Sequence, residues 1–415
     1  MSVLGDTVRA NRAGQRRGIP SFCTAHPETL RAIFAAYRDD EAPILIEATC
    51  NQVNQFGGYT GMKPADFRVF VEGLAREAGV EPTRLILGGD HLGPNPWRNQ
   101  PAASAMAKAR DMVTAYVAAG FTKIHLDASM ACADDVALDE ATMAARAAEL
   151  CAVAEASGQA DLCYVIGTEV PIPGGETEVL DTLAVTAPEA AARTYELHRQ
   201  ALAARGLMSA FSRVIGIVVQ PGVDFGNAQV FGFAPQKAEA LSRSVEELPG
   251  LVFEAHSTDY QSQGALSELV ASHFAILKVG PELTFAFRQA VTALAHIEAA
   301  LNLTEPSRIL EVIAEEMRAN SRDWRAYVAA DDHEVTMMLY GLSDRVRYYW
   351  PRPAIQTALK KLYANIASVR PEPGLVAQFT GRLVEAGSEP AGLARRIIDT
   401  MVGEVVRKYR AATGD

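Results

Sequence analysis

Eight short apolar runs, each ending in a polar residue that can take part in catalysis, recur along residues 19–277 of this 415-residue chain. Continuous apolar runs are typical of strands that are buried on both faces of a parallel sheet. Helical patterns lie between the runs, for example at residues 103–119 and 139–157. Strands and helices that alternate eight times predict an α/β fold, a (β/α)8 TIM barrel. The predicted strands cover residues 19–23, 44–46, 85–87, 123–126, 162–167, 214–219, 251–253 and 274–277.

An open, doubly wound sheet is the alternative fold. Such a sheet usually carries a glycine-rich turn after its first strand, and the residues after 19–23 contain no such turn. The strand pattern stops after residue 288, and helical patterns follow at residues 305–319, 353–368 and 391–411. We therefore expect a barrel over residues 1–290 and a helical C-terminal extension over residues 291–415 that packs on the barrel.

Composition and charge exclude several classes of protein. A net charge of −11 without a basic cluster argues against a nucleic-acid partner. The chain has neither an apolar signal region at its start nor an apolar run long enough to span a membrane, so we expect a cytoplasmic protein without a membrane partner. The five cysteines are scattered and lack paired metal spacing, which indicates reduced thiols in the core.

The sequence around residues 85–94, LILGGDHLGP, places Asp90 and His91 at the end of a predicted strand. The carboxyl ends of barrel strands carry the active site. Side chains alternate along a strand, so these two residues need not share a role. Asp90 suits a general base, and His91, His256 and Glu169 suit the ligands of a divalent metal. The alternatives are hydrogen-bonded structural histidines, a salt bridge for Glu169 and a helix cap for Asp90.

Several motifs together resemble the GatZ/KbaZ family of tagatose-bisphosphate aldolase subunits, and they span nearly the whole chain. The motifs are GIPSFCTAHP, EATCNQVNQFGGYTGM, GGDHLGPNPW, HLDASM, IGTEVPIPGG, EAHSTDYQ, LKVGPELTF and SDRVRYYWP. The resemblance implies a barrel related to class II aldolases, with Asp90 as the proton-transferring acid. It also implies that His91, His256 and Glu169 match metal-site positions, and Glu169 is a catalytic candidate too. Gln220 stands where those aldolases have a histidine ligand, which implies a weaker or altered metal site. We expect zinc, with manganese or nickel as alternatives.

Further strand-end residues are candidates for catalysis or substrate binding. Asp127 could orient a ligand or bind a hydroxyl, whereas we expect His125 to be mainly structural. Lys278, Gly280 and Arg288 lie where barrels often bind phosphate. Arg345 belongs to an arginine- and aromatic-rich segment that could be a packing patch, a phosphate-binding arm or a subunit interface. The substrate-binding candidates are Glu47, Asn51, Gln52, Ser129, Lys278, Gly280, Arg288 and Arg345.

Cleavage of a ketose between C3 and C4 leaves an enediolate that a metal can stabilise, while a base takes the C4 hydroxyl proton. If the aldehyde half turns and the bond re-forms, C4 is inverted. Our main hypothesis is a C4 epimerase that interconverts tagatose 6-phosphate and fructose 6-phosphate. The alternative is a non-catalytic subunit that supports a class II aldolase. The absence of a GxxxxGKS/T loop argues against a sugar-phosphate kinase. Expected partners are a ketohexose phosphate, a class II aldolase subunit and further copies of this chain.

Overall fold

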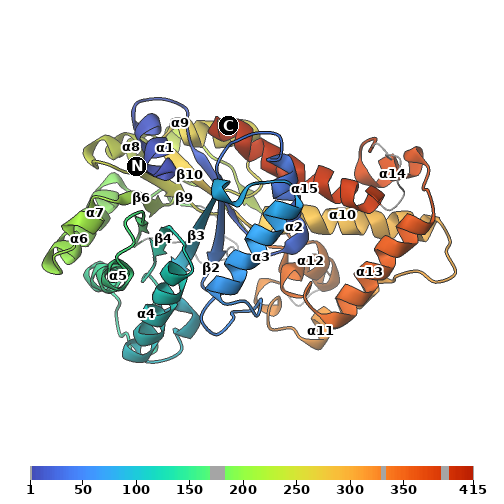
Figure 1. The fold of residues 1–415 in the computed structure, drawn as a ribbon, viewed down its shortest axis with the longest axis horizontal. Helices are drawn as coiled ribbons and strands as arrows, with labels where there is room; N and C mark the ends of the chain where they lie inside the picture. Colours follow the sequence, from blue (N-terminus) through green and yellow to red (C-terminus); the bar gives the residue numbers. More distant parts are fainter. Residues whose placement is uncertain (1, 169–182, 329–332, 385–391, 415) are drawn as a thin grey trace.

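Eight parallel strands form a closed barrel at the centre of the computed structural model, which describes residues 2–168, 183–328, 333–384 and 392–414 (Figure 1). The order around the barrel is β1-β10-β9-β6-β5-β4-β3-β2. All eight predicted strands and the barrel fold are thereby confirmed, and the open sheet is excluded. The strands are β1 Ile19–Cys23, β2 Ile44–Thr49, β3 Leu85–Leu92, β4 Lys123–Leu126, β5 Cys163–Ile166, β6 Val214–Val219, β9 Val252–Ala255 and β10 Phe274–Val279.

Alternation along each strand divides the core into two parts. Leu45 packs inside the barrel with Val165 and Ile276, whereas its neighbours Ile44 and Ile46 belong to the larger core that includes the helices. Strands such as β2 are therefore apolar on both faces, which explains why the sequence shows continuous apolar runs.

Helices surround the barrel, and those predicted at residues 103–119 and 139–157 are confirmed as α4 and α5. Several begin with proline in the first turn, where a missing N–H costs nothing. The helices up to β10 are α1 Val3–Arg12, α2 Pro27–Ala36, α3 Pro64–Glu77, α4 Ala102–Ala118, α5 Glu140–Glu155, α6 Pro188–Ala204, α7 Met208–Phe211, α8 Pro235–Ser244 and α9 Gln263–Ala271. The short pieces are the 3-10 turns η1 Pro82–Arg84, η2 Asn95–Trp97 and η3 Val245–Glu247 and the hairpin β7 Asp224–Phe225 and β8 Val230–Phe231.

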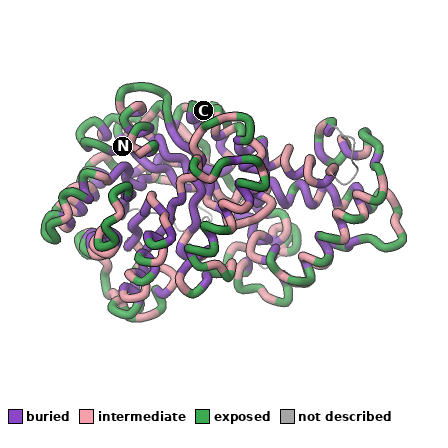
Figure 2. The backbone as a smooth tube through the Cα atoms, viewed as in Figure 1, coloured by how far each residue is buried: buried purple, intermediate pink, exposed green. Residues whose placement is uncertain are grey.

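The chain after β10 is helical, as the sequence predicts. Helix α10 runs out beyond the barrel, and α15 returns beside it to pack on α2 and α9 (Figure 1). The buried residues continue from the barrel along α10 and α15 (Figure 2). The predicted boundary after residue 290 falls inside α10, and the division into two domains stays a prediction. The elements are α10 Pro281–Ala300, α11 Ile309–Ala319, η4 Arg325–Tyr327, α12 Glu334–Tyr340, η5 Arg345–Tyr348, α13 Pro353–Ser368, α14 Pro373–Thr380 and α15 Leu393–Thr413.

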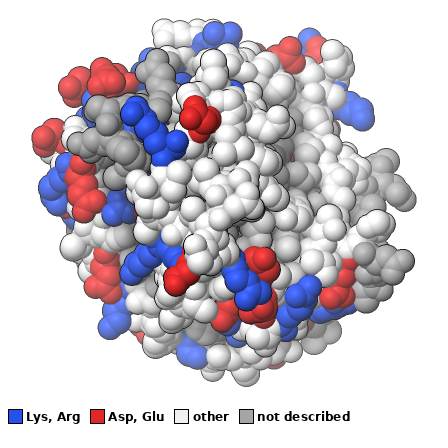
Figure 3. All heavy atoms as spheres, turned by 90° about the vertical axis from the view of Figure 1, so that its right-hand side faces the viewer, with Lys and Arg blue, Asp and Glu red and all other residues white. Residues whose placement is uncertain are grey.

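The face that the extension presents carries acidic and basic side chains interspersed around a broad uncharged area (Figure 3). No helix within the described ranges is long and apolar enough to cross a membrane.

Candidate active site

Four buried side chains converge at the mouth of the barrel. Asp90, His91, His125 and His256 each offer one metal-ligand atom, and these atoms all lie within 4.8 Å of one another. The ring centroids of His91 and His125 are 5.0 Å apart, as are those of His91 and His256. Imidazole nitrogens with a carboxylate oxygen are a donor set that zinc and similar divalent ions prefer.

An irregularity at the end of β3 brings Asp90 and His91 to the same site. Gly89 pairs with Ile124 and Leu92 pairs with Leu126, so Asp90 and His91 together lie opposite one residue of β4, His125. His91 also has a φ of 51°, a left-handed conformation that is unusual for a residue with a side chain. The bulge cancels the alternation that would separate the two side chains in a regular strand.

Each of the three histidines has one ring nitrogen next to a carboxylate. The pairs are His91 Nδ1 with Asp127 Oδ2 at 2.8 Å, His125 Nδ1 with Asp90 Oδ1 at 3.0 Å, and His256 Nε2 with Glu254 Oε1 at 2.9 Å. A carboxylate on one ring nitrogen favours the tautomer that leaves the other nitrogen available to a metal. Nδ1 of His125 also accepts a hydrogen bond from the His91 amide at 3.2 Å. Nε2 of His125 is buried and has no hydrogen-bond partner in the described part of the chain. These residues therefore fit a divalent metal.

Burial and charge set the protonation of the cluster. Burial lowers the pKa of His256 to about 4, so its imidazole is neutral at pH 7. Burial also lowers the pKa of His91, but Asp90 and Asp127 outweigh it and raise that pKa above its ordinary value. Burial raises the pKa of Asp90, yet His91 and Lys278 outweigh this and hold it well below its usual range. Asp90 is therefore ionised.

A buried ionic network lies beneath the cluster. Lys123 Nζ is 2.6 Å from Glu47 Oε1 and 2.8 Å from Glu254 Oε2. Lys278 Nζ is 2.8 Å from Asp90 Oδ2 and also contacts Glu47. Among the described residues of this network three carboxylates outnumber two ammonium groups, and the excess negative charge favours a cation nearby. Glu47, expected to bind substrate, is wholly buried and has both oxygens on lysines, so the structure corrects that expectation.

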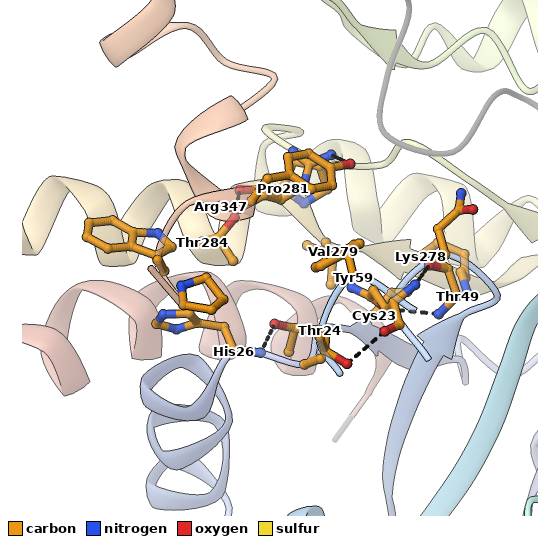
Figure 4. Close-up of a pocket in the computed structure, with 18 of the residues that line it drawn as sticks. Cys23, Thr24, His26, Thr49, Tyr59, Lys278, Val279, Pro281, Thr284 and Arg347 are labelled. Atoms are coloured by element: carbon orange, nitrogen blue, oxygen red, sulfur yellow. Dashed lines mark hydrogen bonds between the residues drawn. The ribbon is translucent and has the colours of Figure 1, made fainter. Parts of the chain in front are cut away.

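A cavity of about 450 Å³ opens above the cluster, and both the barrel and the extension line it (Figure 4). Its volume lies within the range of about 300–1,000 Å³ that is usual for small-molecule sites. His91, His256 and Lys278 lie on the barrel side, and Arg347 and Tyr348 come from the extension. The C-terminal extension thus completes the site.

Comparison with known proteins assigns the chain to a family. The protein-family model described as D-tagatose-1,6-bisphosphate aldolase subunit GatZ/KbaZ-like matches residues 4–414. This chain belongs to the GatZ/KbaZ-like family. The family resemblance of its motifs is thereby confirmed.

Relatives of this GatZ/KbaZ-like chain cover almost its full length. It is 49% identical over 418 residues to the protein named D-tagatose-1,6-bisphosphate aldolase subunit GatZ of Salmonella typhimurium strain LT2, covering 98% of each chain. The protein of the same name from Salmonella paratyphi B matches with the same identity and coverage. A solved structure described as a probable tagatose 6 phosphate kinase from Sinorhizobium meliloti 1021 is 46% identical, with a TM-score of 0.87, over 95% of this chain and 100% of that one.

Other predicted residues of the GatZ/KbaZ-like site fall into two groups. Asn51, Gln52, Lys278 and Gly280 line the cavity. Asp127 lies behind His91, and both the amide and the hydroxyl of Ser129 donate to Asp127 Oδ1, at 2.9 and 2.6 Å. Ser129 is not among the cavity-lining residues, so it supports Asp127 instead of contacting a substrate there.

Two predicted arginines do not reach the cavity of this GatZ/KbaZ-like chain. Arg288 Nε is 2.8 Å from Asp344 Oδ1, and its other nitrogens donate to the carbonyls of Leu339 and Gly341. Arg345 lies 3.7 Å from the ring centroid of Tyr327 and 4.4 Å from that of Tyr348. Both guanidinium groups are buried in the extension, so the structure corrects the expectation that they contact substrate in this cavity.

The other residues considered for the metal site are Gln220, Glu169 and His125. Gln220 Oε1 accepts hydrogen bonds from the amides of Gly222 and Val223, at 2.8 and 2.9 Å, so this oxygen holds its own turn. Glu169 lies outside the described residues. His125, expected to be mainly structural, lies within the cluster, and its role stays a prediction.

Sequence reasoning missed cavity residues at the end of β1. Cys23, interpreted as a core thiol, is half-buried and its Sγ lies 3.6 Å from Asp90 Oδ2. His26 also lines the cavity, and its Nδ1 caps α2 by accepting from the Thr29 amide. The rule that strand ends carry the site applies equally to the segment after 19–23, so the signal was present in the sequence.

Proposed function

We propose that this chain binds a ketohexose phosphate in the cavity and carries out metal-assisted aldol chemistry on its C3–C4 bond. The observation that carries the proposal is the convergence of three carboxylate-backed histidines with an ionised aspartate, in a cluster of which His91 and His256 line that cavity. When bound, a divalent metal supplies Lewis-acid stabilisation of the negative charge that develops on the ketone half. His91, His125 and His256 would hold it.

Asp90 is the group that takes the C4 hydroxyl proton in this proposal. Its Oδ2 faces Lys278 Nζ at 2.8 Å, and its pKa lies well below the usual range, so it is a weak base in the resting site. Proton transfer to Asp90 becomes favourable as the C3–C4 bond breaks, because the C4 oxygen then becomes a carbonyl and its hydroxyl proton grows acidic. Lys278 lines the cavity and can donate to a substrate oxygen while it holds the carboxylate in place.

Two candidate functions differ in whether this chain carries out the chemistry by itself. If the aldehyde stays and turns, the isolated chain inverts C4 and converts tagatose 6-phosphate to fructose 6-phosphate. The names of the relatives favour a second candidate, in which the chain is a subunit that supports a separate catalytic tagatose-bisphosphate aldolase. The relatives' names support the subunit role more strongly than an independent epimerase.

The test uses the purified chain with tagatose 6-phosphate and zinc, manganese or nickel, without ATP or a partner. Formation of fructose 6-phosphate supports the epimerase. Absence of turnover, together with a rise in tagatose-1,6-bisphosphate cleavage when the chain is added to a class II aldolase, supports the subunit role. Product that forms only with ATP supports a kinase, and failure of the metal-free chain to bind any of the three metals overturns the metal site.

A further inference from the structure

Within the described part of the chain, the extension brings one cation without an ion-pair partner into the cavity. Arg347, in η5, lines the cavity on the side opposite Thr24 and His26 (Figure 4). The other lining side chain with a permanent positive charge, Lys278, is bound to Glu47 and Asp90. Arg347 has no carboxylate within ion-pair distance among the residues that the structure describes, so its charge is available to a ligand.

The Arg347 side chain is held by uncharged groups. Its Nη1 donates to the carbonyls of Ser343 and Asp344, and its Nη2 lies 3.1 Å from the Tyr348 hydroxyl. The guanidinium carbon is 4.7 Å from the centroid of the Tyr348 ring, and Tyr59 packs against the same ring with centroids 4.9 Å apart. These contacts leave Nε–H without a partner in the described ranges, while they fix the direction of the guanidinium group.

The segment that carries Arg347 is anchored to the barrel. The buried ion pair of Arg288 with Asp344 joins α10 to this segment. The Leu342 amide donates to the Asn227 carbonyl at 2.8 Å, and the Tyr260 hydroxyl donates to the Leu342 carbonyl. Arg347 therefore has a fixed position relative to the metal-ligand cluster, although it comes from the extension.

We propose that Arg347 binds the phosphoryl group of the substrate and so selects a phosphorylated ketose. This proposal rests on the proposed function for the ketose and adds the residue that recognises its anionic end. A guanidinium group binds phosphate through charge-assisted hydrogen bonds in a planar fork, which a lysine ammonium cannot reproduce. The described part of the cavity offers one unpaired guanidinium, and this matches one phosphoryl group.

The test is calorimetric titration of the full-length protein with tagatose 6-phosphate, tagatose and the corresponding keto-sugar acid. R347A and R347M should weaken tagatose 6-phosphate binding by about 10- to 100-fold and leave tagatose binding unchanged. R347K should give an intermediate loss. R318A, which removes an exposed arginine of α11 and changes the net charge equally, should bind as the wild type does.

Unchanged binding of tagatose 6-phosphate by R347M, or an equal loss for tagatose and its phosphate, overturns the assignment. Tighter binding of the sugar acid than of the phosphate, lost in R347M, assigns a carboxylate ligand and also overturns it. R347M keeps the apolar stem, so it remains informative if R347A does not fold. If the wild type binds tagatose 6-phosphate through Arg347 but shows no turnover with any metal or with an aldolase, the proposed function fails and the Arg347 assignment stands.

Discussion

Nδ1 of His91 lies 2.8 Å from Oδ2 of Asp127, and both side chains are buried. This contact directs the other ring nitrogen of His91 toward the cluster and stabilises the ring orientation that a metal requires. Ser129 holds the second oxygen of Asp127, so the carboxylate is fixed at both ends. The arrangement is typical of a metal ligand with an outer-shell carboxylate.

D127N should therefore weaken zinc binding by about 10- to 100-fold. A neutral amide accepts the hydrogen bond from His91 Nδ1 more weakly than the carboxylate of Asp127 does. The measurement is a calorimetric titration of the metal-free protein with zinc. S129A removes only one support of Asp127 and should lose less. Equal zinc affinity in D127N and the wild type would show that His91 is not a ligand.

H125Q should have a larger effect on zinc affinity than D127N, since His125 lies in the cluster, its Nε2 is buried without a hydrogen-bond partner among the described residues, and it is a direct ligand in this account. The matched control is H198Q. His198 is also buried, with Nδ1 2.8 Å from the Thr194 carbonyl, but it lies on α6 outside the cluster. A normal zinc affinity in H125Q, or an equal loss in H198Q, would return His125 to a structural role.

Zinc affinity should rise with pH through the titration of His91 and become constant above it. Burial lowers the pKa of His91, but Asp90 and Asp127 outweigh it, so the raised pKa keeps a proton on His91 that the metal must displace. His256, with a pKa of about 4, is already neutral in this range and adds no slope. Titrations in buffers of different ionisation enthalpy will count the released protons. Zinc binding that is independent of pH would contradict this assignment.

R288M should destabilise the extension, because it leaves Asp344 as an unpaired buried charge. Loss of one partner of a buried ion pair typically costs about 3–5 kcal/mol in the free energy of unfolding. Urea unfolding measures this cost, and tagatose 6-phosphate binding should weaken while zinc affinity is retained. The double variant R288M/D344N removes both charges and should recover part of the stability. If R288M weakens zinc binding and sugar-phosphate binding equally, the extension supports the metal site as well as the substrate site, which contradicts this prediction.

The sequence predicts the barrel well because strands buried on both faces are apolar at most positions. The strand-end rule likewise locates Asp90, His91, His256 and Lys278 at one face of the barrel. His125 could not be assigned in this way, because only the bulge at the end of β3 places it opposite Asp90 and His91. A register irregularity of this kind leaves no clear signal in an apolar run.

The binding residues were harder to predict for a different reason. Arg345 and Arg347 are two positions apart in one 3-10 turn, and only packing decides which side chain enters the cavity and which stacks on Tyr327. Glu47 is predicted to bind substrate from its strand end, but Lys123 and Lys278 from two other strands bind its carboxylate below the cavity. Contacts between distant segments determine both outcomes, so local patterns cannot.

The most direct measurement of the central claim is metal-dependent turnover of tagatose 6-phosphate by D90N and the wild type, each stripped of metal and reloaded with the same ion. Both proteins should bind the metal, because His91, His125 and His256 remain. D90N should lose turnover of tagatose 6-phosphate, since the C4 hydroxyl proton then has no carboxylate to receive it. Full turnover by D90N, or wild-type turnover that persists without any metal, would contradict an aldol site built on Asp90 and the three histidines.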